Sequence, residues 1–248
     1  MNYLAIFESE LIDRNHARLV STRARYAIEV HELKAGLSFS VVVINQGRKK
    51  AQVLNISTNE INLLLSEDVD VLPQEPIELI VAIPRPQTLR KVLQLSATFG
   101  IKALHLIRSE NVVKSYLTSK RLEPQAIEED LLLGIEQSGS TCLPEVFIHH
   151  RFQQFVEDYL PLRMKSYNDF KAVVADTHKN ADISLNEINF PNPERGVFIA
   201  IGPESGWNQY EVEKFQVLSF SIISLGKRIL RVETACTALI SQIQLLKN

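Results

Sequence analysis

The sequence has too few cysteines for a disulfide-rich protein, and its hydrophobic runs are too short for a membrane-spanning one. Its only two cysteines, Cys142 and Cys236, lie far apart, so a disulfide framework is excluded and a reducing compartment is expected. No apolar run approaches the roughly 18 residues that a membrane span needs. Residues 1–10 lack the basic and apolar parts of a signal peptide. We therefore expect a cytoplasmic protein that does not contact a membrane.

An excess of positive charge is also missing. The net charge is −2 and the pI is near 6.3, so binding to nucleic acid would depend on local clusters of basic residues. Such clusters are present, although each is more often simply a solvated face. They are Arg14, Arg18, Arg23 and Arg25, then Arg48, Lys49 and Lys50, then Lys227 and Arg228.

Several motifs of known chemistry are absent as well. The sequence has no G-x-G-x-x-G after its first strand, no Walker lysine, no H-E-x-x-H and no G-x-S-x-G. His149 and His150 are adjacent, but no third ligand stands at a suitable spacing. We therefore expect neither a classical nucleotide fold nor a metal site.

Short apolar runs predict a β-rich module in the first seventy residues. Asn, Gly and Ser separate these runs, and such residues between β-branched segments favour hairpins. The pattern is typical of a small barrel or curled sheet. Pro73 and Pro76 then interrupt the chain, which predicts a boundary between residues 1–73 and 74–248. The runs are residues 39–45, 50–56 and 61–65.

After residue 76 the pattern changes to apolar strands that alternate with amphipathic helices. Strands that are apolar on both faces imply a parallel sheet covered by helices. Gly100 follows the helix expected at 88–98 and predicts its C-terminal cap. The fold class is therefore α/β, preceded by the β-rich module. The expected strands are 77–83, 103–107, 146–148, 170–176, 196–201 and 221–225, and the other expected helices include 126–136 and 153–158.

Two glycine-containing loops, at residues 202–206 and 225–231, each follow an expected strand. In α/β folds, ligands bind at the carboxyl ends of strands, and glycine lets the backbone approach a flat ligand closely. Asn208 with Glu211 predicts a capped helix after the first loop, and Thr234 is a candidate cap for the final helix. Either loop alone is more often an ordinary turn, but the pair predicts a cofactor cleft.

The loop residues resemble the RsmE-type methyltransferases of the SPOUT superfamily. Those proteins typically carry I-G-P-E-G-G and L-G-x-R-I-L-R-x-E-T-A, and this chain has Ile201-Gly-Pro-Glu-Ser-Gly206 and Leu225-Gly-Lys-Arg-Ile-Leu-Arg-Val-Glu-Thr-Ala235. The similarity extends upstream and covers most of the chain. Departures from the family pattern include Ser205 in place of glycine, and Ser140 and Glu32 at positions where arginine is frequent.

The resemblance implies a PUA-like, RNA-binding β-barrel at 1–73 and, at 74–248, a SPOUT methyltransferase domain with a C-terminal trefoil knot. Knots are exceptional, and periodicity does not predict them. The resemblance further implies a homodimer that uses S-adenosylmethionine to methylate N3 of one uridine in 16S rRNA of the small ribosomal subunit. Two alternatives stay open: a related SPOUT enzyme acting on tRNA or another rRNA site, and a non-catalytic RNA-binding or ribosome-assembly factor.

The resemblance assigns the cofactor-binding residues, the chemistry of methyl transfer the catalytic candidates, and the basic clusters the RNA-binding residues. Arg231 is the first candidate for a cation that stabilises charge developing on the uracil, and Glu204 and Glu233 are candidate bases or neighbours of the sulfonium. An ion pair that only locks the loop is the alternative. Trp207 either stacks on a base or packs against the next helix. The expected cofactor-binding residues are Ala175, Ile201, Gly202, Pro203, Gly206, Leu225, Gly226, Ile229 and Leu230, and the expected RNA-binding residues are Arg23, Arg25, Arg48 and Lys49.

Overall fold

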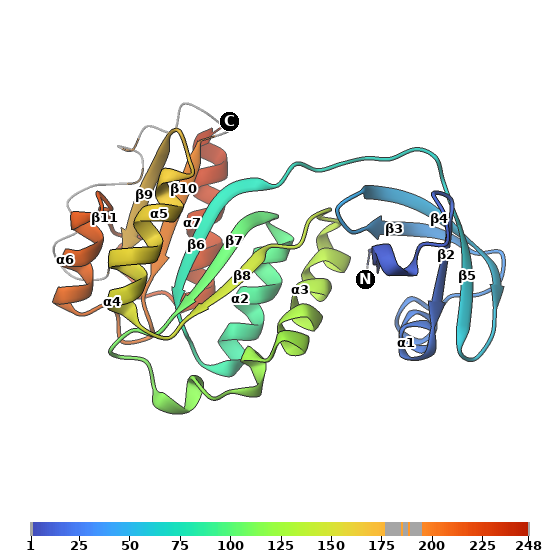
Figure 1. Cartoon of the computed structure of the whole chain (residues 1–248), viewed down its shortest axis with the longest axis horizontal. Helices are drawn as coiled ribbons and strands as arrows, with labels where there is room; N and C mark the ends of the chain where they lie inside the picture. Colours follow the sequence, from blue (N-terminus) through green and yellow to red (C-terminus); the bar gives the residue numbers. More distant parts are fainter. Residues whose placement is uncertain (1, 177–184, 186–187, 189–194, 248) are drawn as a thin grey trace. The chain divides into compact units, whose positions relative to one another are not determined.

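The computed structural model describes residues 2–176, 185, 188 and 195–247. Contacts divide the chain into two units, each with its own sheet (Figure 1). The first unit is Met1–Gln74, Ala97–Gly100 and Leu131–Leu143, and the second is Glu75–Ser96, Ile101–Asp130 and Pro144–Asn248.

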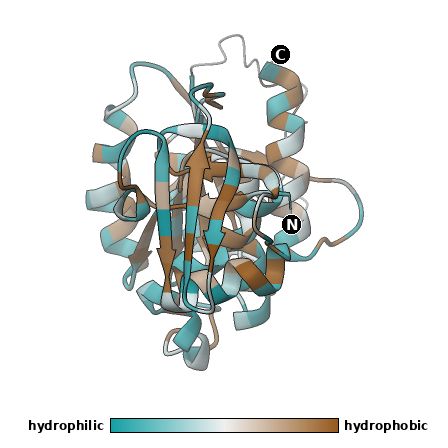
Figure 2. Cartoon of the chain, turned by 90° about the vertical axis from the view of Figure 1, so that its right-hand side faces the viewer, coloured by the Kyte–Doolittle hydropathy of each residue, from teal (hydrophilic) through white to brown (hydrophobic). Residues whose placement is uncertain are grey.

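The first unit contains a five-stranded sheet in the order β1-β3-β4-β5-β2. Only β1 and β3 pair in parallel, and the other pairs are antiparallel. Hydrophobic and hydrophilic residues alternate along its strands, which face the viewer in Figure 2, so one face packs on an apolar core. The elements are β1 (Leu4–Ile6), β2 (His16–Val20), α1 (Ser21–His31), β3 (Ser38–Val43), β4 (Gly47–Ile56) and β5 (Glu60–Leu65).

The second unit contains a parallel six-stranded sheet in the order β11-β9-β10-β6-β7-β8. Its central strands are buried along almost their whole length, as expected for a sheet covered on both faces. The strands are β6 (Glu75–Ala82), β7 (Ile101–Ile107), β8 (Glu145–His149), β9 (Phe170–Ala175), β10 (Gly196–Ile201) and β11 (Ser221–Ile223).

Helices cover both faces of this sheet (Figure 1). One face carries α2, α7 and the part of α3 up to Asp130, and the other carries α4, α5 and α6. A π-helical turn, Phe155–Tyr159, joins α4 to α5. The helices are α2 (Pro86–Thr98), α3 (Pro124–Ser138), α4 (Phe152–Gln154), α5 (Leu160–Lys165), α6 (Gln209–Val217) and α7 (Val232–Lys247). No helix among the described residues is long and apolar enough to cross a membrane.

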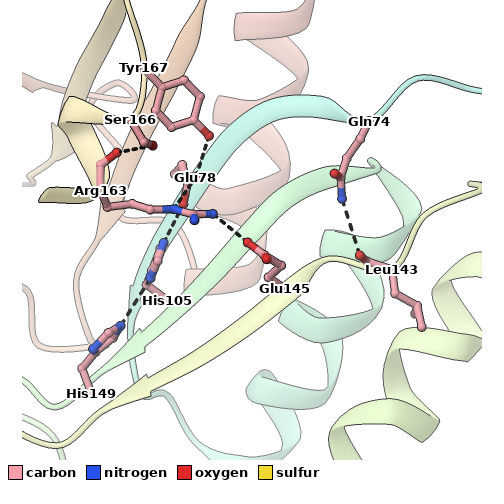
Figure 3. Close-up of polar contacts among 9 residues, drawn as sticks. All are labelled: Gln74, Glu78, His105, Leu143, Glu145, His149, Arg163, Ser166 and Tyr167. Atoms are coloured by element: carbon pink, nitrogen blue, oxygen red, sulfur yellow. Dashed lines mark hydrogen bonds and ion pairs between the residues drawn. The ribbon is translucent and has the colours of Figure 1, made fainter. Parts of the chain in front are cut away.

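A buried polar network links the sheet to α5 (Figure 3). Glu78 of β6 is fully buried and accepts hydrogen bonds from Tyr167 and Arg163, and it lies 2.7 Å from His105 Nε2. His105 in turn lies 3.3 Å from His149. Burial alone would raise the pKa of Glu78, but its hydrogen bonds and the charge of Arg163 outweigh burial and lower that pKa. The ionised carboxylate thus joins β6 to Arg163 of α5 and to Tyr167, which follows that helix.

Most of the expected elements are present, with two corrections. The helix α1 was not expected, because the first seventy residues were interpreted as β-rich. Thr234 does not cap the final helix: α7 begins at Val232, so Thr234 lies in its first turn. By contrast, Asn208 caps α6 as predicted, and Gly100 has the positive φ of 61° expected after α2.

Candidate active site

The two glycine loops converge on one cavity of about 610 Å³ in the second unit. The cavity lies at the carboxyl ends of β9, β10 and β11 and at the starts of α2 and α7, the edge of the sheet where α/β folds bind ligands. It is lined by Arg85, Gln87, Thr88, Lys91, Ala175, Asp176, residues 201–206, residues 224–226, residues 228–233 and Ala235.

The first loop is tightly folded, and glycine is required in it. A Cβ atom on Gly202 would lie 3.1 Å from the backbone nitrogen of Trp207, closer than neighbouring atoms normally approach. Gly206 has a φ of 79° and its N–H donates to the carbonyl of Pro203, which closes a turn. Ser205 does not have a positive φ, so the departure from glycine at this position introduces no backbone strain.

The helix α6 holds the end of this loop in place. The Asn208 side chain accepts from the N–H of Glu211, and Glu211 accepts from the N–H of Asn208, which forms a capping box. The second Glu211 oxygen accepts from the N–H of Glu110. Trp207 is 3% exposed and packs edge-on against Phe215. Trp207 therefore belongs to the core under the loop and is not a stacking platform for a base.

Glu204 is tied to the loop that precedes α2. Its carboxylate accepts from the backbone N–H of Arg85 at 3.2 Å and lies 3.5 Å from the Arg85 guanidinium. These contacts join the loop after β6 to the loop after β10 across the mouth of the cavity. A pair this exposed contributes little to stability, but it limits where the Glu204 carboxylate can point.

Glu233 lies deeper in the cavity and is paired with Lys91 of α2. The Lys91 Nζ atom is 3.0 Å from Glu233 Oε1, while Glu233 Oε2 is buried and has no hydrogen-bond partner among the described residues. Burial alone would raise the pKa of Glu233, but the hydrogen bond from Lys91, the carboxylate's own backbone N–H at the start of α7, and the charges of Lys91 and Arg231 lower it overall. The structure therefore favours an ionised carboxylate at Glu233.

Every residue expected to act in catalysis or cofactor binding lines this cavity. The three candidate catalytic residues are Arg231, Glu204 and Glu233. The candidate cofactor-binding residues are Ala175, Ile201, Gly202, Pro203, Gly206, Leu225, Gly226, Ile229 and Leu230.

The four expected RNA-binding residues differ in whether their side chains form ion pairs within the protein. Arg23 pairs with Glu10 and its guanidinium donates to the carbonyl of Ala5, and Arg48 donates to the carbonyl of Gly139 and pairs with Asp70. Both arginines thus have structural contacts within the first unit. Arg25 is exposed and donates to the Asn59 side chain, whereas Lys49 is half-buried, like Arg48, and donates to the carbonyl of Arg14.

Sequence reasoning missed Lys91 and the role of Arg85. The helix at 88–98 was identified from its apolar face, and Lys91 lies on the opposite, polar face, where a lysine is unremarkable. Its partner Glu233 is 142 residues away. A contact over that distance leaves no local signal in the sequence.

A second hollow of about 670 Å³ lies at the carboxyl ends of β7 and β8. It is lined by Arg108, Arg151, Glu110 and Asp158 among other residues, and no glycine loop borders it. Its mixed charges favour no single ligand. Within the described part of the chain, no group of three His, Cys, Asp or Glu residues is arranged to hold a metal ion.

Comparison with known proteins identifies a family and several related proteins. The family model for the RNA methyltransferase domain matches residues 71–244. Ribosomal RNA small subunit methyltransferase E of Treponema pallidum is 29% identical over 241 residues, which cover 95% of this chain and 88% of that protein. The protein of the same name from Synechocystis is 26% identical over 247 residues, with 99% and 78% covered.

Solved structures share the fold. The crystal structure of ribosomal RNA small subunit methyltransferase E from Neisseria gonorrhoeae, bound to S-adenosyl methionine, superposes with a TM-score of 0.80 at 21% identity and 98% coverage of both chains. A Legionella pneumophila putative methyltransferase in complex with the same cofactor gives a TM-score of 0.78 at 18% identity, with 99% and 98% covered. These likenesses concern the fold.

Proposed function

Because the chain belongs to the RNA methyltransferase domain family, we propose that it transfers a methyl group from S-adenosylmethionine to N3 of one uridine in the 16S RNA of the small ribosomal subunit. The observation that carries the proposal is the convergence of both glycine loops and Glu233 on one cavity. The names of its relatives, small-subunit ribosomal RNA methyltransferases, give the substrate class.

The cavity suits S-adenosylmethionine in size and chemistry. Its volume of about 610 Å³ lies within the range of small-molecule sites. No atom lies within 4 Å of where a Cβ on Gly226 would stand, so its backbone is open to a flat adenosine, and the buried, unpartnered oxygen of Glu233 offers an acceptor to a donor group of the cofactor. When bound, S-adenosylmethionine supplies an activated methyl group on a sulfonium.

We assign the chemical roles to residues at the rim and floor of the cavity. N3 of uridine lies on the Watson–Crick edge and carries a weakly acidic proton, so the base must be unpaired and must lose that proton. Arg231 immediately precedes α7 and lines the cavity, and its guanidinium stabilises the negative charge that develops on a uracil oxygen. Glu204, the more exposed carboxylate at the mouth, is the better placed base, and Glu233 stays ionised inside.

Further parts of the proposal concern the whole molecule. The first unit is proposed as a PUA-like RNA-binding barrel, with the exposed Arg25 and the half-buried Lys49 as its phosphate contacts, because neither forms an ion pair among the described residues. The C-terminal segment is proposed to form the trefoil knot of the SPOUT fold. The support for the knot is the resemblance of residues 201–206 and 225–235 to the SPOUT motifs. We also propose that the protein acts as a homodimer.

Primer extension across 16S rRNA tests the function. A methyl group on N3 blocks Watson–Crick pairing, so reverse transcriptase should stop at the modified uridine. We expect the stop to disappear in cells that lack the gene, to return with the wild-type gene, and to return at most weakly with Arg231→Ala. If 16S rRNA shows no difference, the proposed target is wrong, and the same assay on tRNA and 23S rRNA identifies another. Full restoration by Arg231→Ala would remove Arg231 from catalysis.

A further inference from the structure

The ion pair between Lys91 and Glu233 joins two helices that are far apart in sequence. Lys91 lies in the second turn of α2 and Glu233 in the first turn of α7, and both line the cofactor cavity. The Glu233 side chain is only 14% exposed, whereas that of Lys91 is 56% exposed. The carboxylate is therefore the buried member, and the lysine reaches in from solvent to meet it.

The two oxygens of Glu233 have different surroundings. Oε1 accepts a hydrogen bond from Lys91 Nζ at 3.0 Å, and Oε2 is buried without a hydrogen-bond partner in the described part of the chain. A buried carboxylate oxygen without a donor is costly to a folded protein. Because both residues line the ligand cavity, this oxygen is a candidate acceptor for a donor group of the ligand.

We propose that Lys91 is a positioning residue, which orients Glu233 so that Oε2 receives a hydrogen bond from a donor group of the bound cofactor. This inference rests on the proposed function, because it takes S-adenosylmethionine as the ligand of the cavity. Lys91 acts through Glu233: it holds one oxygen and supplies the positive charge that keeps the buried carboxylate ionised. S-adenosylmethionine and its product S-adenosylhomocysteine both carry an ammonium group and ribose hydroxyls, so both satisfy Oε2.

Calorimetric titration of both ligands into the purified protein tests the proposal. Lys91→Met removes a hydrogen bond between charged groups. This loss should weaken the binding of both ligands about tenfold. Lys91→Arg should restore most of the affinity. The matched control is Lys214→Met, which breaks another lysine–glutamate pair, with Glu157, outside the cofactor cavity; it should leave both affinities unchanged.

A double-mutant cycle separates an indirect role of Lys91 from direct contact with the ligand. If Lys91 acts through Glu233, Lys91→Met combined with Glu233→Gln binds no more weakly than Glu233→Gln alone. Additive losses would overturn the proposal, because they would place Lys91 itself on the ligand. If Lys91→Met does not fold, the comparison of Lys91→Arg with Glu233→Gln still decides, since only the second should lose affinity.

The pH dependence of binding gives a readout that simple loss of packing would not change. Burial raises the pKa of Glu233, and Lys91 counteracts that effect through its hydrogen bond and its charge. Without Lys91 the pKa of Glu233 should therefore rise. Affinity in Lys91→Met should therefore begin to fall at a higher pH than in the wild type as the solution is acidified. Identical pH profiles would overturn the inference. If the wild type binds neither ligand, it is the proposed function that fails.

Discussion

At the scale of single residues, the cofactor loop depends on the absence of a side chain at Gly202. An added Cβ would lie 3.1 Å from the Trp207 nitrogen and 3.3 Å from the Gly206 carbonyl carbon, and both are backbone atoms that can move only if the loop moves. Overpacking of this kind costs about 1–3 kcal/mol. We expect Gly202→Ala to weaken S-adenosylmethionine binding about tenfold, measured by calorimetry, with little change in the circular dichroism spectrum.

Ser205 provides the control within the same loop. It has no positive φ and is exposed, so Ser205→Ala and Ser205→Gly should both bind the cofactor nearly as the wild type does. Unchanged binding in Gly202→Ala would show that the loop does not contact the cofactor through its backbone. A strong loss in Ser205→Gly would show instead that the serine hydroxyl has a role at the site.

At the scale of elements, the start of α6 secures the end of the cofactor loop. Asn208 Oδ1 accepts from the Glu211 N–H at 2.8 Å, and replacing an Asn cap with Ala typically costs about 1 kcal/mol. We expect Asn208→Ala to lower the free energy of unfolding by about that amount in urea denaturation. Asn208→Ser keeps a capping oxygen and should recover most of the loss. Equal stability of the two variants would contradict the capping role.

The elements that the sequence predicts well are those whose pattern is local. Strand β10 matches the expected residues 196–201, and helix α2 ends at the expected Thr98, because an apolar run or a helix followed by glycine is readable within a few residues. Helix α1 was missed because its sequence is mostly polar and only Ala24 and Ala27 are buried. With only the partly buried Tyr26 and Ile28 beside them, these two small residues give a weak helical stripe.

The candidate site was predictable for the same reason. Its expected residues lie in two short loops, at the ends of β9 and β10 and in the first turn of α7, and most of them are recognisable from the motifs of a family. Lys91 and the network around Glu78 were not predictable. A glutamate inside an apolar strand is interpretable only when the side chains facing it are known, and these come from β7, α5 and the residues that follow α5.

At the scale of the whole molecule, each unit contains polar groups that only the folded chain brings together. Residues 131–143 belong to the first unit, where Glu136 accepts hydrogen bonds from Tyr26 and from the N–H of Ala5. Burial raises the pKa of Glu136 despite those hydrogen bonds. Local patterns give no sign of this packing, because nothing in the sequence of helix α3 shows that its residues from 131 onward belong to the first unit.

Buried histidines should make both units less stable in acid. Burial, with nearby positive charge, lowers the pKa of His31 in the first unit and of His149 in the second to about 4. The unfolded chain, in which histidine has a pKa near 6.5, therefore binds more protons between about pH 6.5 and 4. Stability then falls as the pH falls through this window. Urea denaturation at several pH values should show the free energy of unfolding decreasing from pH 7 to pH 4.5.

The slope of the free energy of unfolding against pH separates the contributions of the two histidines. His149→Asn and His31→Asn each remove one group that takes up a proton on unfolding. In each variant the free energy of unfolding should therefore change less steeply with pH, with the number of protons taken up on unfolding reduced by up to one. This holds whatever the stability of the variant at pH 7. Glu136 acts with the opposite sign, since its raised pKa makes the folded state bind the extra proton. That contribution is present in the wild type and in His149→Asn alike, and it cancels in their difference. A slope unchanged by His149→Asn would mean that His149 takes up its proton over the same pH range in the folded and the unfolded chain.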